Sequence, residues 1–179
     1  VTGDYPPEKL RSSITAQQQT PQVISDIELH LADLFEQVSP SVVAITVTQE
    51  LNDSENSGSP FNEPQRSSGT GFVIDLNGHI VTNYHVVETS EDVVVYFVDG
   101  TITRASVVGL DPDADIAVVK VDLPPERLRP IAFGRMNEVF VGQSVIAIGS
   151  PFGNDWTLTS GIVSALDRAI PSLSQYNIG

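Results

Sequence analysis

One histidine and one aspartate stand where a β scaffold could hold a proton-handling pair. His85 ends the apolar segment HIVTNYH, expected to be a strand, and strand ends often carry catalytic side chains. Asp115 directly precedes IAVVKV, so its carboxylate is expected at the edge of a packed core, where it needs a hydrogen-bond donor. An imidazole N–H suits this need, and the aspartate in return fixes the tautomer of the imidazole and stabilises its cation. Taken singly, each residue has an ordinary alternative: a buried histidine bonded to a carbonyl, or an aspartate that caps a turn.

Other motifs that could bind a ligand or a metal ion are rejected. The segment GTG at 69–71 lacks a third glycine and precedes a strand, so it is not a phosphate-binding loop. The acidic spacing of DPDAD suits a calcium loop, but Ile116 stands where that loop requires glycine. His79 follows Asn-Gly and is expected to be a surface residue beside a turn. There is no cysteine, which removes disulfides, thiolate metal sites and cysteine nucleophiles.

The composition excludes several partner classes. The chain carries 23 acidic and 9 basic residues, a formal net charge of −14, which argues against nucleic acid and against a basic membrane-surface helix. Hydrophobic residues make up 40% of the 179, enough for a packed core. No apolar run approaches the roughly 18–20 residues that span a bilayer.

Short β-branched segments between turn formers predict an all-β fold. With helical βαβ spacing absent, they favour a sandwich or a barrel. One short amphipathic helix is expected over 26–37, because Ser25 and Glu28 form an N-terminal capping pattern. The expected strands are 41–49, the two arms of a hairpin within 68–87, 92–98, 101–110, 116–121, 131–133, 144–148 and 158–166.

Four motifs together resemble the HtrA/Deg family of serine proteases (DegP-, DegS- and DegQ-like). SSGTGFVID, VTNYHVV, DPDADIAVVKV and AIGSPFGNDWTLTSGIVSALDR have the order and spacing of that family, over roughly residues 34–168. The resemblance implies a trypsin-like domain of two six-stranded β-barrels with the active site between them. By the match to TN-x-HV, His85 takes the place of the general base. By the match to D-x-x-x-D-I-A, Asp115 takes the place of the orienting aspartate.

The resemblance also divides the chain. We expect a flexible tail over 1–24, a helix and first barrel with the histidine and aspartate over 25–122, and an inter-barrel connection over 123–130. Residues 131–179 are expected to begin a second barrel that is truncated in this chain. The loop 51–67 matches a regulatory loop of the family or is a solvated surface loop.

The family's nucleophile is expected outside these residues. The serine lies in a GNSGG motif downstream of the SGIVSA strand, and that motif does not occur in this chain. Thr70 and Ser150 depart from the family's commoner Ser and Asn, without touching the proton relay. Four serines fall in segments expected to be strand or turn, so none is expected to be the nucleophile: Ser68, Ser144, Ser150 and Ser160. The chain alone is expected to be inactive.

The resemblance implies a serine endopeptidase for protein quality control under stress, acting on unfolded or damaged proteins. It implies no metal, nucleotide or other cofactor. It implies an exported protein, periplasmic or otherwise extracytoplasmic, with a membrane tether upstream, a PDZ domain downstream and homotrimeric assembly as further expectations. One alternative is a chaperone or peptide-binding module that keeps the fold without catalysis. The presence of both His85 and Asp115 argues against it. Another is a nicked protease whose second half is a separate chain.

Overall fold

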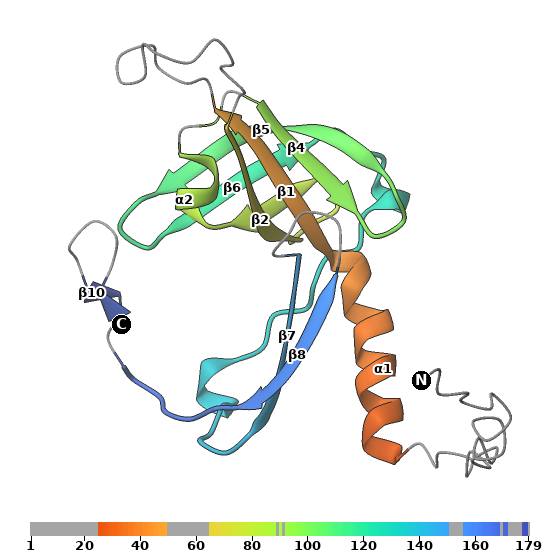
Figure 1. Cartoon of the computed structure of the whole chain (residues 1–179), viewed down its shortest axis with the longest axis vertical. Helices are drawn as coiled ribbons and strands as arrows, with labels where there is room; N and C mark the ends of the chain where they lie inside the picture. The colour runs from red at the N-terminus through yellow and green to blue at the C-terminus, as the bar shows by residue number, and fades with distance from the viewer. Residues whose placement is uncertain are drawn as a thin grey trace, which may run out of the picture.

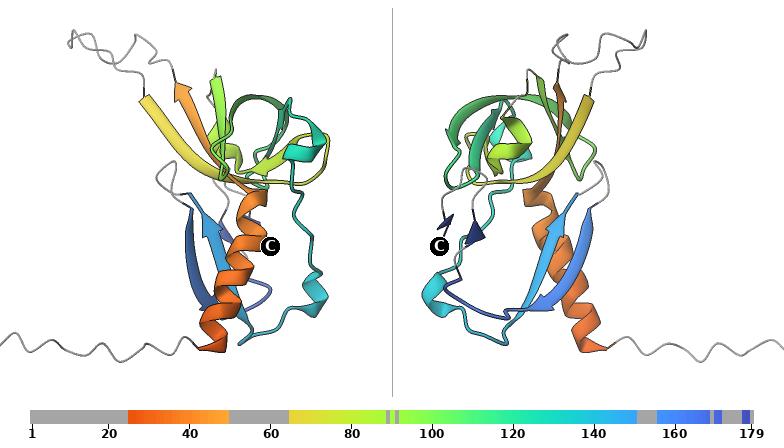
Figure 2. Two further views of the ribbon diagram at one scale, coloured as in Figure 1. Left: turned by 90° about the vertical axis from the view of Figure 1, so that its right-hand side faces the viewer. Right: turned by 60° about the vertical axis from the view of Figure 1, so that its left-hand side comes forward.

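The computed structural model describes residues 25–49, 65–88, 90, 92–150, 156–168, 170–171 and 177–178. A β-barrel lies at one end of the molecule, and a helix and a two-stranded ladder lie at the other (Figures 1 and 2). The prediction of a flexible tail over 1–24 lies outside the described residues. The loop predicted over 51–67 lies outside them as far as residue 64, and its last part, 65–67, is wrong because these residues begin the strand β2 (Gln65–Val73) and pair with β1.

The described barrel strands are all antiparallel to their neighbours. Their order is β1-β2-β3-β6-β5-β4, and β4 pairs back with β1 to close the barrel. A closed barrel leaves no strand edge open to a foreign chain. Of the two architectures expected from the sequence, the structure therefore forms the barrel. The strands are β1 (Val42–Gln49), β2 (Gln65–Val73), β3 (His79–Thr82), β4 (Asp92–Phe97), β5 (Ile102–Asp111) and β6 (Ile116–Val121).

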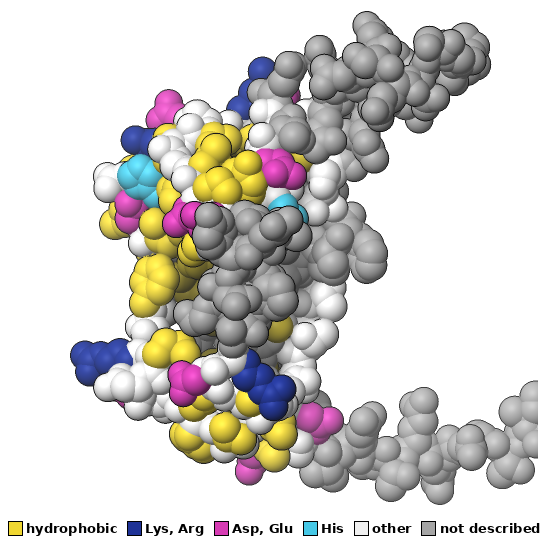
Figure 3. Space-filling model, turned by 90° about the vertical axis from the view of Figure 1, so that its left-hand side faces the viewer, with side chains coloured by type: hydrophobic (Ala, Val, Ile, Leu, Met, Phe, Trp, Pro, Cys, Tyr) yellow, Lys and Arg dark blue, Asp and Glu magenta, His cyan; other side chains and the backbone are white. Residues whose placement is uncertain are grey.

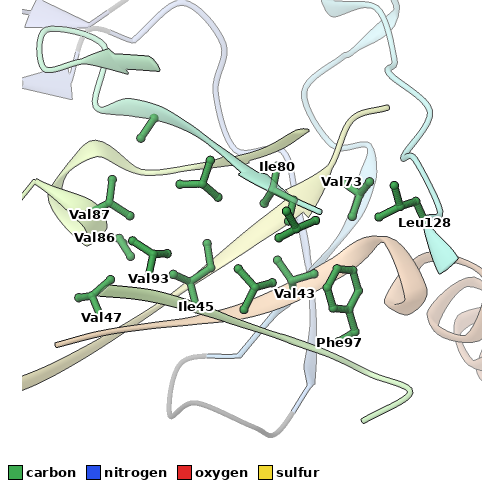
Figure 4. Close-up of a cluster of buried hydrophobic side chains, with 14 residues drawn as sticks. Val43, Ile45, Val47, Val73, Ile80, Val86, Val87, Val93, Phe97 and Leu128 are labelled. Atoms are coloured by element: carbon green, nitrogen blue, oxygen red, sulfur yellow. The ribbon is translucent and has the colours of Figure 1, made fainter. Parts of the chain in front are cut away.

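The core of the barrel is made by alternate residues of its strands (Figure 4). Val43, Ile45 and Val47 of β1 are fully buried, as the side-chain period of two in a strand requires. The facing strands contribute Val93, Val95 and Phe97 from β4, and Ala117, Val119 and Val121 from β6. Burying each such aliphatic side chain stabilises the fold by about 1.5–3 kcal/mol, so this core holds the barrel rigid under the site.

The expected helix is confirmed as α1 (Asp26–Val38), and a capping box begins it. The Ser25 N–H donates to Glu28 Oε2 at 2.7 Å, and the Glu28 N–H donates to Ser25 Oγ at 3.3 Å. A groove of about 790 Å³ separates α1 from the antiparallel ladder of β7 (Ser144–Gly149) and β8 (Thr157–Ile162). The helix thus lies beside this ladder, as Figure 2 shows. Among the described helices, none combines the length and hydrophobicity needed to cross a bilayer.

Two strand predictions after the barrel are wrong. Residues 131–133 form no strand, because their only backbone bond to the barrel is the single one from the Ile131 N–H to the Val73 carbonyl at 2.9 Å. β8 ends at Ile162 and not at residue 166. Val163 still exchanges backbone hydrogen bonds with Gly142 and Gln143, which precede β7, and Asp167 has a φ of +55° that no regular strand adopts. The remaining short elements are η1 (Ser39–Ser41), η2 (Pro125–Arg127), η3 (Met136–Glu138), β9 (Ile170–Pro171) and β10 (Asn177–Ile178).

Side-chain hydrogen bonds tie the ladder to the barrel. Trp156 Nε1 donates to the Val42 carbonyl at 2.9 Å, and the Ser150 N–H donates to Thr70 Oγ1 at 2.9 Å. Thr70 and Ser150, the two departures from the family pattern, therefore contact each other. Apolar side chains are nevertheless exposed beyond the barrel: Phe133, Met136, Phe140 and Val141 are each more than half exposed. Figure 3 shows hydrophobic side chains at the surface of this end.

We predict that Gly78→Ala destabilises the barrel more than Gly100→Ala. Both glycines have positive φ, 88° and 84°, where alanine is strained by about 1–2 kcal/mol. A Cβ on Gly78 would also lie 2.2 Å from the Val121 carbonyl oxygen, whereas a Cβ on Gly100 meets nothing within 4 Å. With both effects together, Gly78→Ala should lower the free energy of unfolding by about 3 kcal/mol or more. Urea unfolding of both variants measures this difference, and equal losses would show that the close approach to Val121 is unimportant.

Candidate active site

His85 lies in a short helix and not at the end of a strand, so that prediction is wrong. β3 ends at Thr82, and α2 (Tyr84–Val87) follows. Val86 and Val87 are both buried, 5% and 3% exposed, and successive residues of a strand cannot face one core together. The helix packs closely on β2, since a Cβ on Gly69 would lie 2.5 Å from Val86. The absence of a side chain at Gly69 thus leaves room for Val86 of α2.

His85 and Asp115 contact each other through their side chains. Nδ1 of His85 lies 2.8 Å from Oδ2 of Asp115 and 3.0 Å from Oδ1, and the His85 backbone N–H donates to Oδ1 at 3.0 Å. The imidazole is 48% exposed and the carboxylate 19%. The carboxylate therefore holds one ring nitrogen, and the tautomer with Nδ1–H leaves a lone pair on Nε2. The catalytic role of this pair stays a prediction.

Asp115 is held in an unusual conformation by residues at the start of α2. Its φ is +53°, in the left-handed region, which costs a non-glycine residue about 1–3 kcal/mol. The Tyr84 N–H donates to its carbonyl at 3.2 Å, and Asn83 Nδ2 contacts both this carbonyl, at 3.2 Å, and Oδ2, at 3.1 Å. Asn83 was not singled out by the sequence analysis, although it belongs to the TN-x-HV motif.

The pKa of the Asp115 carboxyl is set by opposing effects. Burial raises this pKa, but hydrogen bonds from the His85 backbone and side chain, the charge of His85 and a hydrogen bond from Asn83 together lower it below its ordinary value. The carboxyl is therefore ionised at neutral pH. An ionised carboxylate at this place can orient the imidazole and stabilise its protonated form.

A second histidine–aspartate pair lies at the turn between β2 and β3. His79 Nδ1 is 2.6 Å from Asp75 Oδ2, and the backbone N–H groups of His79 and Asn77 donate to Asp75 Oδ1 at 3.1 and 2.9 Å. The sequence analysis missed this pair, whose signal is the D-x-x-x-H spacing across the turn. Within the described part of the chain, no three acidic, histidine or cysteine side chains are grouped to hold a metal ion.

We predict that the Asp75 pair stabilises the fold fully above about pH 4 and progressively less below it. The hydrogen bond from the His79 side chain is the largest cause that lowers the pKa of Asp75 from 3.8 to about 2. Because the folded pKa is depressed, the stabilisation is present above 3.8 and is lost as the pH falls towards about 2. Melting temperatures of the wild type and of Asp75→Asn should differ at pH 5 and converge near pH 2. A difference that is constant over this range would contradict the prediction.

The four serines of the sequence analysis lie in or beside strands. Ser68 is in β2, Ser144 begins β7 and Ser160 is in β8. Ser150 follows β7, and its Oγ is buried without a hydrogen-bond partner among the described residues. Among the described residues, no hydrogen bond joins His85 to any of these four serines, and their rejection as the nucleophile stays a prediction.

Comparisons with known proteins agree with this geometry. Residues 69–178 match the trypsin-like peptidase domain family. "Protease Do-like 1, chloroplastic" from Arabidopsis thaliana is 45% identical over 86% of this chain and 34% of its own length. "Probable periplasmic serine endoprotease DegP-like" from Pseudomonas fluorescens is 36% identical over 78% of this chain and 35% of its own.

Solved structures of the same group share the fold. Deg5 superposes with a TM-score of 0.69 at 38% identity, over 87% of this chain and 72% of that one. The HtrA-type protease AlgW with a tripeptide superposes with a TM-score of 0.65 at 31% identity, over 75% of this chain and 40% of the AlgW chain. The fold and the site define a trypsin-like peptidase domain. Within that class, the chain belongs to the HtrA/Deg family of serine endopeptidases. It spans only about a third of the length of these two curated relatives.

Proposed function

We propose that this chain supplies the general base and the orienting aspartate of a serine endopeptidase. The observation that carries the proposal is the contact between His85 Nδ1 and Asp115 Oδ2 at 2.8 Å, on a rigid barrel of a trypsin-like peptidase domain. A histidine held in this way has its second nitrogen free to take a proton.

In this mechanism, His85 Nε2 removes the proton of a serine hydroxyl as the serine oxygen attacks a peptide carbonyl. The same nitrogen then gives the proton to the leaving amine, and Asp115 stabilises the imidazolium between the two steps. The serine and the N–H groups that stabilise the oxyanion belong to a GNSGG motif of the full-length protein. That motif does not occur in residues 1–179.

The substrates proposed are unfolded or damaged proteins, which present extended peptide segments. AlgW, an HtrA-type protease, has been solved with a tripeptide bound, and DegP-like relatives are named periplasmic and Do-like relatives chloroplastic. These names support a protein exported from the compartment of its synthesis. We add homotrimeric assembly, a downstream PDZ domain and an upstream membrane tether to the proposal.

The test is an assay of unfolded casein with the full-length protein and with the 179-residue chain. We expect cleavage by the full-length protein and none by the 179 residues, because a base without a nucleophile forms no acyl-enzyme. Casein cleavage by the 179-residue chain would refute the proposal that the nucleophilic serine lies outside these residues. If the full-length protein suppresses casein aggregation without cleaving casein, the protein is instead a chaperone that keeps the protease fold without catalysis.

A further inference from the structure

We propose that Asn83 is a positioning residue whose carboxamide fixes the Asp115 side chain against its own main chain, in the rotamer that holds His85. The inference rests on the proposed function, in which Asp115 orients the base. It assigns a task to a residue that forms no hydrogen bond to His85 among the described residues and acts on it through Asp115.

The geometry of the carboxamide carries this inference. Asn83 Nδ2 lies 3.2 Å from the Asp115 carbonyl oxygen and 3.1 Å from Oδ2. An amide NH₂ has two N–H donors, so one group can serve both oxygens at once. These oxygens belong to the main chain and the side chain of one residue, and a bridge between them restrains rotation about χ1. Oδ2 is also the oxygen that lies 2.8 Å from His85 Nδ1.

The position of Asn83 in α2 supports the same assignment. Asn83 is the N-cap residue of this helix, and an asparagine there normally accepts a hydrogen bond from a backbone N–H of the first turn. The Asn83 side chain makes no such capping bond and donates to Asp115 instead. The residue thus lacks its usual local partner and contacts one that is 32 positions away in sequence.

Asp115 needs such a restraint because its own loop holds it weakly. Its φ of +53° is strained for a residue with a Cβ. Its own N–H reaches the Pro112 carbonyl only at 3.4 Å. Most of the bonds that fix it come from three consecutive residues, Asn83, Tyr84 and His85. Without the Asn83 bridge, the carboxylate keeps its bonds to His85 but gains freedom to rotate, and the imidazole moves with it.

The experiment compares Asn83→Ala and Asn83→Asp with the wild type in the full-length protein. Asn83→Asp keeps the shape of the side chain but replaces both N–H donors by a carboxylate. The matched control is Asn137→Ala, which removes an exposed asparagine on η3, away from the site. The Asp115 pKa is measured by carbon NMR titration of labelled aspartate, with the signal assigned by its loss in Asp115→Asn. The kcat and KM for a casein-derived peptide are measured on the same samples.

We expect the Asp115 pKa to rise in both variants, and more in Asn83→Asp, where a second negative charge faces the carboxylate. We expect kcat to fall roughly tenfold to a hundredfold with KM unchanged, since displaced catalytic groups slow the chemical step. If the Asp115 pKa is unchanged in both variants, or if kcat is unchanged in both, Asn83 does not have the proposed role. Asn83 is exposed, and the same spectra report whether each variant is folded.

Failure of the proposed function is recognised separately. If the wild-type protein has no peptidase activity, the proposed function is refuted. The titration of Asp115 would still show whether Asn83 restrains this side chain. An active wild type with unperturbed Asn83 variants refutes only the positioning role.

Discussion

Replacing His85 with alanine is expected to lower the kcat of the full-length protein by roughly 10⁶-fold, with little change in KM. Among the described groups that contact Asp115, the imidazole is the one that can take the serine proton and return it to the leaving amine. Casein-derived peptides with a fluorescent reporter measure the loss. Turnover that persists in His85→Ala would refute the assignment of the general base.

The matched control for His85→Ala is His79→Ala. His79 also contacts an aspartate through Nδ1, at 2.6 Å, but it lies at the turn between β2 and β3. Its pair stabilises that turn and has no part in the proposed proton transfer. Activity should therefore remain at the wild-type level, and a comparable loss would show that the two pairs have been assigned the wrong roles.

Replacing Asp115 with asparagine is expected to lower kcat by about 10⁴-fold. Asparagine has the shape of aspartate, but it cannot stabilise the imidazolium, and an amide N–H that faces Nδ1 favours the wrong tautomer of His85. Stopped-flow or discontinuous assays at saturating peptide measure the effect. Asp75→Asn removes the other paired carboxylate and should retain activity, whereas equal losses in both variants would indicate unfolding and not chemistry.

Most of the barrel could be predicted from local sequence pattern. In β4 and β6 every second residue is buried, and Gly78 and Gly100 mark turns with positive φ. The N-terminal helix followed equally from Ser25 and Glu28, three residues apart. In these segments the local preference and the tertiary packing favour the same structure.

The site itself depends on contacts that local pattern does not record. The chain after Thr82 folds into α2, and its backbone N–H groups bond to Asp115, about thirty residues away. Asn83 acquires its role only through the same distant partner. Two adjacent valines do not reveal α2 in the sequence, because Val42 and Val43 are also adjacent and lie within β1.

Beyond the barrel, the strand prediction over 131–133 failed for a related reason. Ile131 forms a single backbone bond to β2, and Phe133, which is 71% exposed, contacts Phe72 edge to face at 6.3 Å. An apolar segment becomes a strand only when a neighbouring strand satisfies its backbone groups. None of the described strands pairs with this segment.

The most direct test of the central claim is labelling of the full-length protein with a serine-directed fluorophosphonate, followed by mass spectrometry. We predict one labelled serine, in a GNSGG motif outside residues 1–179. Labelling should be at least roughly a thousandfold slower in His85→Ala and unchanged in His79→Ala. Equal labelling rates in the wild type and His85→Ala, or a label on a serine within the 179 residues, would contradict it.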